Sequence, residues 1–135
     1  MRAFFILILS AVFLISCNSI KRTQKYAAKG DYDKAISLAV KKLQKDKNAK
    51  EYDAHIPVLE DAFKKAKEDD LQRIDFLKKQ NSEVGKREIY YTYLNLQARQ
   101  NLIRPLLPLY SKSLGRNGIF QFEDFNRELV QAQDA

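Results

Sequence analysis

The chain begins with a long apolar run, and apolar and polar residues alternate with helical spacing after it. The run spans residues 3–16, contains only Ser10 and Ser16 as polar members, and follows Arg2. A membrane-spanning helix needs about 20 apolar residues, so this run is too short to cross a bilayer. A positive charge, an apolar centre and a small final residue are typical of a secretory signal peptide. We therefore expect residues 1–16 to be cleaved.

Past this run, apolar residues recur three and four positions apart, which predicts amphipathic helices. Gly30 is suited to end a short first helix at residues 20–29, and Asp31 is suited to cap the second. Pro57 should lie inside the third helix or near its start. We predict an all-α fold, with these core-facing positions in the second and third helical segments: Tyr32, Ala35, Ile36, Ala39, Val40, Leu43, Tyr52, Ile56, Leu59, Phe63, Ala66, Leu71, Ile74, Phe76 and Leu77.

The most apolar helix of the mature domain is predicted at residues 86–103. It carries two neighbouring apolar stripes, and so wide an apolar face indicates a central helix packed on two sides. Pro105 and Pro108 should end or kink it, and the apolar residues between them favour a buried corner over a polyproline-type ligand. The stripes are Ile89, Tyr93, Leu96 and Ile103, and Tyr90, Leu94, Ala98 and Leu102.

The last part of the chain is predicted to contain a turn, a short strand and one more helix. Gly115 and Gly118 flank a loop or tight turn that lacks the lysine and hydroxyl residue of a phosphate-binding loop. A short strand is expected at residues 119–122. A helix is expected at residues 123–133, with Phe125 on its apolar side.

The stretch KGDYDKAI, residues 29–36, resembles the turn between the paired helices of a tetratricopeptide repeat. In that family a small residue, here Ala35, lets the two helices approach. The resemblance implies a small antiparallel helical array. The usual proline after the second helix is replaced by Lys47, and no second unit matches well near the expected period of 34 residues. The number of repeats is therefore left open.

The stretch LISC, residues 14–17, resembles the lipobox of bacterial lipoproteins. The resemblance implies that the thiol of Cys17 receives a diacylglyceryl group and that the signal peptide is cleaved before it. The alternative is a core cysteine after an uncleaved anchor. Two or more acyl chains hold a protein stably on a membrane. The implied organisation is a signal peptide at 1–16, a lipidated cysteine and short linker at 17–22, and a helical domain at 23–135.

The whole mature chain also resembles uncharacterised Bacteroidota lipoproteins, which carry a segment like EIYYTYLNLQARQNLIRPLLPLY, residues 88–110. That resemblance implies no activity. The chain has 24 Lys and Arg against 17 Asp and Glu, and a formal net charge of +7. A basic protein is a candidate for binding nucleic acid. Here, however, acidic residues lie between the lysines, and an exported protein rarely meets nucleic acid. We expect a solvated surface and no nucleic-acid partner.

No residue pattern indicates catalysis or a cofactor. His55 is the only histidine and stands beside no serine or cysteine pairing, and one histidine does not make a zinc site. The acidic pairs and triplets are more simply read as charged helix faces and helix starts. We expect a protein without enzymatic activity and without a cofactor or metal. These acidic clusters are Glu60-Asp61, Glu68-Asp69-Asp70 and Glu123-Asp124.

Two functions remain from different classes. The first is a lipid-anchored helical module that binds another envelope protein. The second is a binding protein for an envelope glycan or small ligand, using an aromatic and basic surface. Its candidate residues are Tyr91, Arg99, Arg104 and Tyr110, although the tyrosines are also explained as core residues whose hydroxyls reach water.

The predicted address is the outer membrane, facing the periplasm, with attachment through the lipid on Cys17. The residue after the cysteine is Asn18, not the aspartate that resembles an inner-membrane retention signal in enteric bacteria. No acidic run follows to resemble a surface-export signal.

Overall fold

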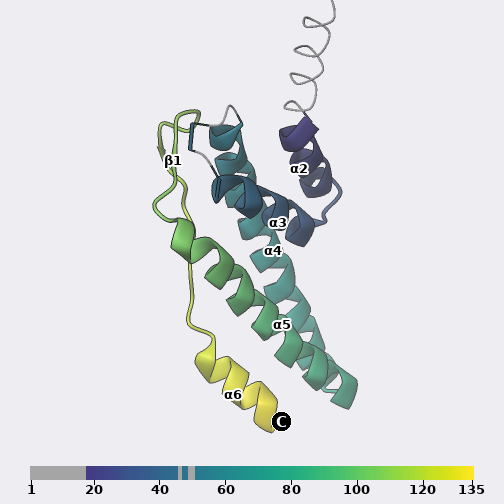
Figure 1. Cartoon of the computed structure of the whole chain (residues 1–135). Helices are drawn as coiled ribbons and strands as arrows, with labels where there is room; N and C mark the ends of the chain where they lie inside the picture. Colours follow the sequence, from purple (N-terminus) through teal and green to yellow (C-terminus); the bar gives the residue numbers. More distant parts are fainter. Residues whose placement is uncertain (1–17, 46, 49–50) are drawn as a thin grey trace, which may run out of the picture. The chain divides into compact units, whose positions relative to one another are not determined.

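A computed structural model describes residues 18–45, 47–48 and 51–135, and it is mainly helical (Figure 1). The predicted all-α class is confirmed. The predicted signal peptide and Cys17 lie outside the described residues. The elements are α2 (Asn18–Ala28), α3 (Tyr32–Leu43), α4 (Tyr52–Gln80), α5 (Glu83–Ile103), the 3-10 helix η1 (Arg104–Leu106), β1 (Tyr110–Ser111), β2 (Arg116–Asn117) and α6 (Asn126–Asp134).

The chain divides into two compact units, and neither is a continuous stretch of sequence. The first unit contains the described residues up to Ala62 together with Pro108–Gly118. The second contains Phe63–Leu107 and Ile119–Ala135. The helix α4 contributes residues to both units, and Pro57 lies inside it, in its second turn.

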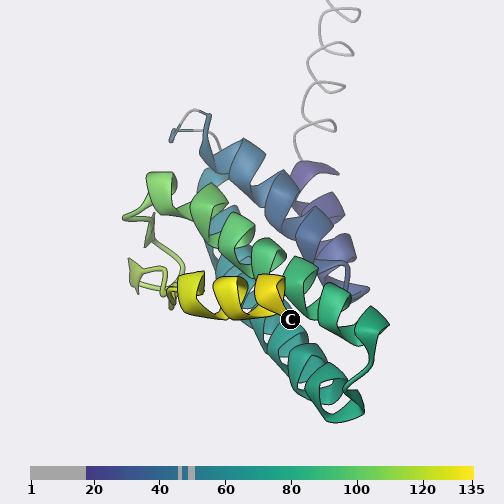
Figure 2. The ribbon, with the colours of Figure 1, turned by 90° about the horizontal axis from the view of Figure 1, so that it is seen from below.

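In the first unit, α2 and α3 pack side by side through the predicted glycine turn (Figure 2). Gly30 has a φ of +80°, a left-handed conformation that glycine adopts at little cost. The Asp31 carboxylate caps α3 by accepting from the Lys34 backbone N–H at 3.3 Å. Ala35 is fully buried, as expected of the small residue at this helix pair. The buried face of α3 is the predicted one and consists of Ala35, Ile36, Ala39, Val40 and Leu43. Tyr32, also predicted to face the core, is only half-buried.

The first unit also contains a small antiparallel hairpin in which Tyr110 pairs with Asn117 and Ser111 with Arg116. Its turn is held by Asp53 of α4, whose carboxylate accepts from the backbone N–H groups of Lys112 and Ser113. Burial raises the pKa of Asp53, but these hydrogen bonds outweigh it, so the pKa lies below 3.8.

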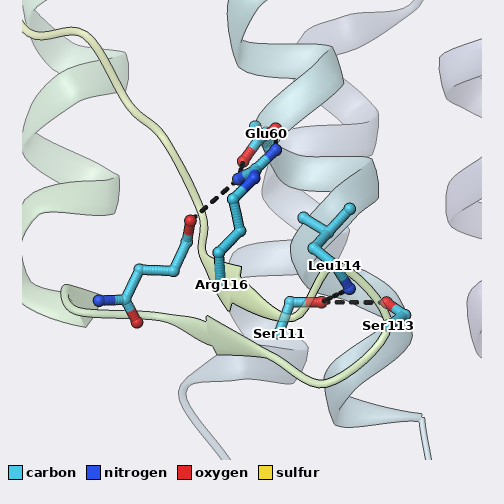
Figure 3. A network of polar contacts seen from close by, with 6 residues as sticks. Glu60, Ser111, Ser113, Leu114 and Arg116 are labelled. Carbon is cyan, nitrogen blue, oxygen red and sulfur yellow. Dashed lines mark hydrogen bonds and ion pairs between the residues drawn. The ribbon is translucent and has the colours of Figure 1, made fainter.

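A second set of polar contacts joins the hairpin to α4 (Figure 3). The Arg116 guanidinium donates to both carboxylate oxygens of Glu60, at 2.8 and 2.9 Å. Within the turn, the Ser111 hydroxyl oxygen accepts from the Leu114 N–H at 3.2 Å and lies 3.0 Å from the Ser113 hydroxyl. The forked guanidinium geometry fixes the direction of approach as well as the charge, so β2 has a defined position against this part of α4.

The second unit is built from the later part of α4, with α5 and α6. The helices α5 and α6 lie against each other (Figures 1 and 2). Ser82 caps α5 by accepting from the Gly85 N–H at 3.0 Å. A Cβ at Gly85 would lie 2.9 Å from the Ser82 Oγ, so a larger residue there would push against the cap. The shared core consists of Ile74, Leu77, Ile89, Tyr93, Leu96 and Phe125.

The helix α5 packs against both α4 and α6, but the second apolar stripe predicted on it does not form a buried face. Its first stripe is buried, but Ala98 and Leu102 of the second stripe are exposed, and Tyr90 and Leu94 are only half-buried. Polar side chains complete the buried face of the helix instead of the second apolar stripe. These are Thr92, Arg99 and Gln100.

The strand predicted at residues 119–122 is absent from the described structure, and this segment has no regular secondary structure. Phe120 and Phe122 both pack edge-on against Phe63 of α4, with ring centroids 5.7 Å away in each case. Between them, the Gln121 carbonyl accepts from the Lys67 ammonium at 3.1 Å. Side chains of α4 thus make the contacts that a neighbouring strand would have made.

The last helix begins at Asn126, three residues later than the predicted start at residue 123. The side-chain amide of Gln100 holds the preceding backbone: its nitrogen donates to the Glu123 carbonyl at 2.8 Å and its oxygen accepts from the Glu123 N–H at 2.7 Å. The Asp124 carboxylate then accepts from the Asn126 N–H at 2.9 Å. These bonds keep residues 123–125 outside the helix.

Candidate functional site

The residues predicted to form a binding surface do not share one environment. Tyr91 on α5 is 58% exposed, with its ring 5.6 Å from that of Tyr90. Arg104 is exposed, and its guanidinium carbon lies 5.3 Å from the centre of the Phe122 ring. Tyr110 is 60% exposed, but it belongs to the first unit, whereas the other three belong to the second.

The prediction that Arg99 contributes to this surface is wrong. Its side chain is only 5% exposed, and its Nη1 atom lies 2.9 Å from Oδ2 of Asp70 on α4. The sequence carried a signal for this position. Arg99 stands three residues after Leu96 and four before Ile103, so it falls on the buried stripe of α5.

We predict that Arg99→Met destabilises the protein by roughly 2–3 kcal/mol. Removing one member of a fully buried ion pair costs about 3–5 kcal/mol. The expected cost is smaller here because Asp70, the partner, is partly exposed to water. Chemical denaturation measures the change. Arg87→Ala on the exposed face of the same helix is the control and should change the free energy of unfolding by less than about 0.5 kcal/mol. Equal effects of the two substitutions would contradict a structural role for Arg99.

His55 is completely buried in the first unit and links α4 to α2. Its Nδ1 atom lies 2.7 Å from the Glu51 carbonyl oxygen, and its Nε2 atom lies 3.3 Å from the Thr23 hydroxyl. A carbonyl only accepts, so Nδ1 carries the proton. The Thr23 hydroxyl has one hydrogen, and it faces two acceptors: Nε2 of the neutral ring and the Ser19 carbonyl oxygen, 3.1 Å away. Burial holds the pKa of His55 below 6.5. The ring is therefore occupied by structural hydrogen bonds.

We predict that the protein loses stability as the pH falls below about 6.5. Above that pH the His55 ring is neutral in both states; below it the unfolded chain takes up a proton first, so the free energy of unfolding falls. Denaturation at pH 7.5, 6.5 and 5.5 measures this slope. His55→Gln should flatten it, whereas Thr23→Val should lower stability and leave the slope in place. An unchanged slope in His55→Gln would overturn the assignment.

The second unit contains a cavity of about 210 Å³ where the end of α4, the start of α5 and α6 meet. Its apolar wall includes Leu77 and Ile89, both part of the core. Polar groups from each of the three elements face the same space. The full lining is Leu77, Lys78, Asn81, Lys86, Ile89, Tyr93, Glu128, Gln131, Ala132 and Ala135.

The charges in this cavity are unequally satisfied. The Lys86 ammonium is paired with Glu83 at 2.9 Å. The Lys78 ammonium donates to the Tyr93 hydroxyl at 3.3 Å and lies 5.7 Å from the centre of that ring, but it has no carboxylate partner among the described residues. The Glu128 Oε2 atom is buried and has no hydrogen-bond partner in the described structure. The cavity thus holds one cation and one anion that do not neutralise each other.

Sequence reasoning did not identify this cavity. Glu128 follows Phe125 by three residues and precedes Ala132 by four, so it lies on the side of α6 that faces α5. An acid at a core-facing helical position was the available signal. Lys78 and Tyr93 gave none, because a lysine near a helix end and a tyrosine in an apolar stripe both have ordinary structural roles.

The comparisons with known proteins supply no function. No protein-family model, curated protein or solved structure matches the chain. Among the described residues, no group of three or more His, Cys, Asp and Glu side chains is placed to hold a metal ion. In the same part of the chain, no helix has both the length and the apolar character needed to cross a bilayer.

Proposed function

We propose that this protein is a lipid-anchored envelope protein that acts as a non-catalytic helical module for binding another protein. The anchor is Cys17 in the lipobox-like stretch LISC, and the location is the outer membrane, facing the periplasm. The observation that carries the proposal is a row of exposed apolar side chains along α5. The row, called the α5 stripe below, consists of Val84, Tyr91, Ala98 and Leu102.

The α5 stripe follows one line of the helix. Its members are spaced seven, seven and four residues apart, which places them along one side of the helix, with Glu88 and Asn95 on the turns between the first three. Val84 is 77% exposed and Leu102 is 49% exposed. Large apolar side chains exposed on one side of a helix are consistent with a protein interface, and tyrosine is enriched at interfaces. The row also matches the way an amphipathic partner helix contacts a groove or seam.

The anchor predicts that fatty-acid labelling and membrane attachment both depend on Cys17. In cells fed radioactive palmitate, the wild-type chain should be labelled and should sediment with the outer membrane, because two or more acyl chains hold a protein stably on a bilayer. Cys17→Ala should remove the label and the attachment, whereas Ser19→Ala should keep both. Labelling that survives Cys17→Ala would remove the anchor from the proposal.

The orientation of the protein on the outer membrane can be tested with protease. With the protein facing the periplasm, protease added to intact cells should leave it whole, and protease added after the outer membrane is opened should cleave it. Cleavage in intact cells would place the domain on the cell surface.

The α5 stripe predicts a partner contact at Tyr91. A photo-crosslinking amino acid in place of Tyr91 should give a discrete adduct of higher mass in intact cells, because the stripe would be covered by the partner. The matched control is Gln72, an exposed position on α4 of the same unit, which should give no adduct. Absence of an adduct at position 91, or equal adducts at both positions, would overturn the interaction role.

A second candidate function is the binding of a small envelope ligand. The observation that favours it is the cavity lined by Lys78 and Glu128, whose charges lack partners of opposite sign among the described residues. Protein binding through the α5 stripe and ligand binding in the cavity use different surfaces of the second unit, so one does not require the other.

A further inference from the structure

We propose that the cavity between α4, α5 and α6 binds a small zwitterion with an apolar body, of the class of a free aliphatic α-amino acid. The ligand ammonium would lie beside Glu128 and its carboxylate beside Lys78, with the side chain against Leu77 and Ile89. This inference rests on the second candidate function, small-ligand binding, and is independent of the protein-interaction role.

The size of the cavity limits the ligand. Its volume is about 210 Å³. An apolar protein cavity of about 150 Å³ accommodates benzene, which has six heavy atoms. A molecule of roughly nine heavy atoms therefore fills the space.

The charges of the cavity decide the class of ligand. The half-buried Glu128 side chain lines the cavity, and its buried Oε2 atom has no hydrogen-bond partner among the described residues, so a cationic group beside this carboxylate would be stabilised. A ligand with an ammonium group would supply the missing charge. Lys78 on the same lining would repel a ligand that is only cationic.

The same reasoning excludes a ligand that is only anionic. Lys78 would attract it, but Glu128 would oppose it, and the Glu128 carboxylate would stay without a partner. Lys86 adds little net attraction, because Glu83 already neutralises it. Only a molecule with both charges satisfies both sides of the cavity. The Tyr93 hydroxyl accepts from the Lys78 ammonium at 3.3 Å, and its own hydrogen is available to donate to a bound carboxylate.

The apolar part of the lining favours an aliphatic side chain. Leu77 and Ile89 are almost fully buried, and Ala132 leaves room beside them. Each methylene group removed from water contributes about 0.8 kcal/mol. The zwitterion leucine, with its branched aliphatic side chain, is therefore the probe of choice.

Isothermal titration calorimetry on the full chain purified in detergent tests the proposal. Three probes share the 3-methylbutyl chain: leucine, 4-methylpentanoate, which lacks the ammonium, and 3-methylbutylamine, which lacks the carboxylate. Leucine should bind saturably at millimolar concentration or below, and each of the other two should bind at least about tenfold more weakly, since each loses one charge-assisted contact.

Substitutions identify the two ends of the ligand. Glu128→Gln should weaken leucine binding by about tenfold or more and should not weaken 4-methylpentanoate binding. Lys78→Met should weaken leucine and leave 3-methylbutylamine unchanged. Asp134→Asn removes a negative charge from the same helix outside the cavity lining and should bind leucine like the wild type. Circular dichroism confirms that each variant is folded before titration.

Several outcomes would overturn the proposal. These are no saturable leucine binding, equal binding of all three probes, or unchanged leucine binding by folded Glu128→Gln. The α5 stripe is tested by crosslinking at position 91 without any added ligand, so failure of the cavity proposal and failure of the interaction role give different results.

Discussion

The second unit depends on polar side chains of α5 being satisfied inside it. Arg99 reaches Asp70 on α4, and Gln100 brackets the backbone of Glu123 with both atoms of its amide. Apolar side chains in place of Arg99 and Gln100 would fill the same space but would not fix the position of Asp70 or of the Glu123 backbone. Hydrogen bonds made by a guanidinium or an amide are directional, whereas apolar contacts are not. The Arg99 bond joins the two long helices, and the Gln100 bonds set where α6 begins.

The placement of α6 creates the cavity. Residues 123–125 stay outside the helix, and Phe125 enters the core 5.7 Å from the Tyr93 ring. The next turn brings Glu128 to the space beside the end of α4, where Lys78 lies. The Gln100 hydrogen bonds, which set the start of α6, thus also determine which charged residues line the candidate ligand site. The α5 stripe is a separate surface and remains exposed.

Helical spacing predicted most of the fold, because most apolar positions of α3 and α4 face their cores as the 3.6-residue period requires, and the Gly30 turn follows from backbone chemistry. The exceptions on α4 are Leu71 and Phe76, which were expected in the core and are exposed. It failed where partners distant in sequence decide the structure. Arg99 looked like a surface residue because Asp70, its partner, is on another helix. The strand expected at residues 119–122 gave way to aromatic contacts with Phe63. The cavity was not predictable, since it arises only when three separate segments meet.

The division of the chain has a consequence for the proposed export of the protein as an unfolded chain. Residues 108–118 complete the first unit, so in the proposed export that unit would lack its hairpin until Phe63–Leu107 of the second unit had also passed through the export channel. Contacts between remote parts of a sequence form slowly, because the intervening loop must close first. During that interval Asp53 and Glu60 have no hairpin to hold, and exposed apolar surface of an incomplete unit is prone to aggregation. Early attachment to a bilayer would keep such nascent molecules apart.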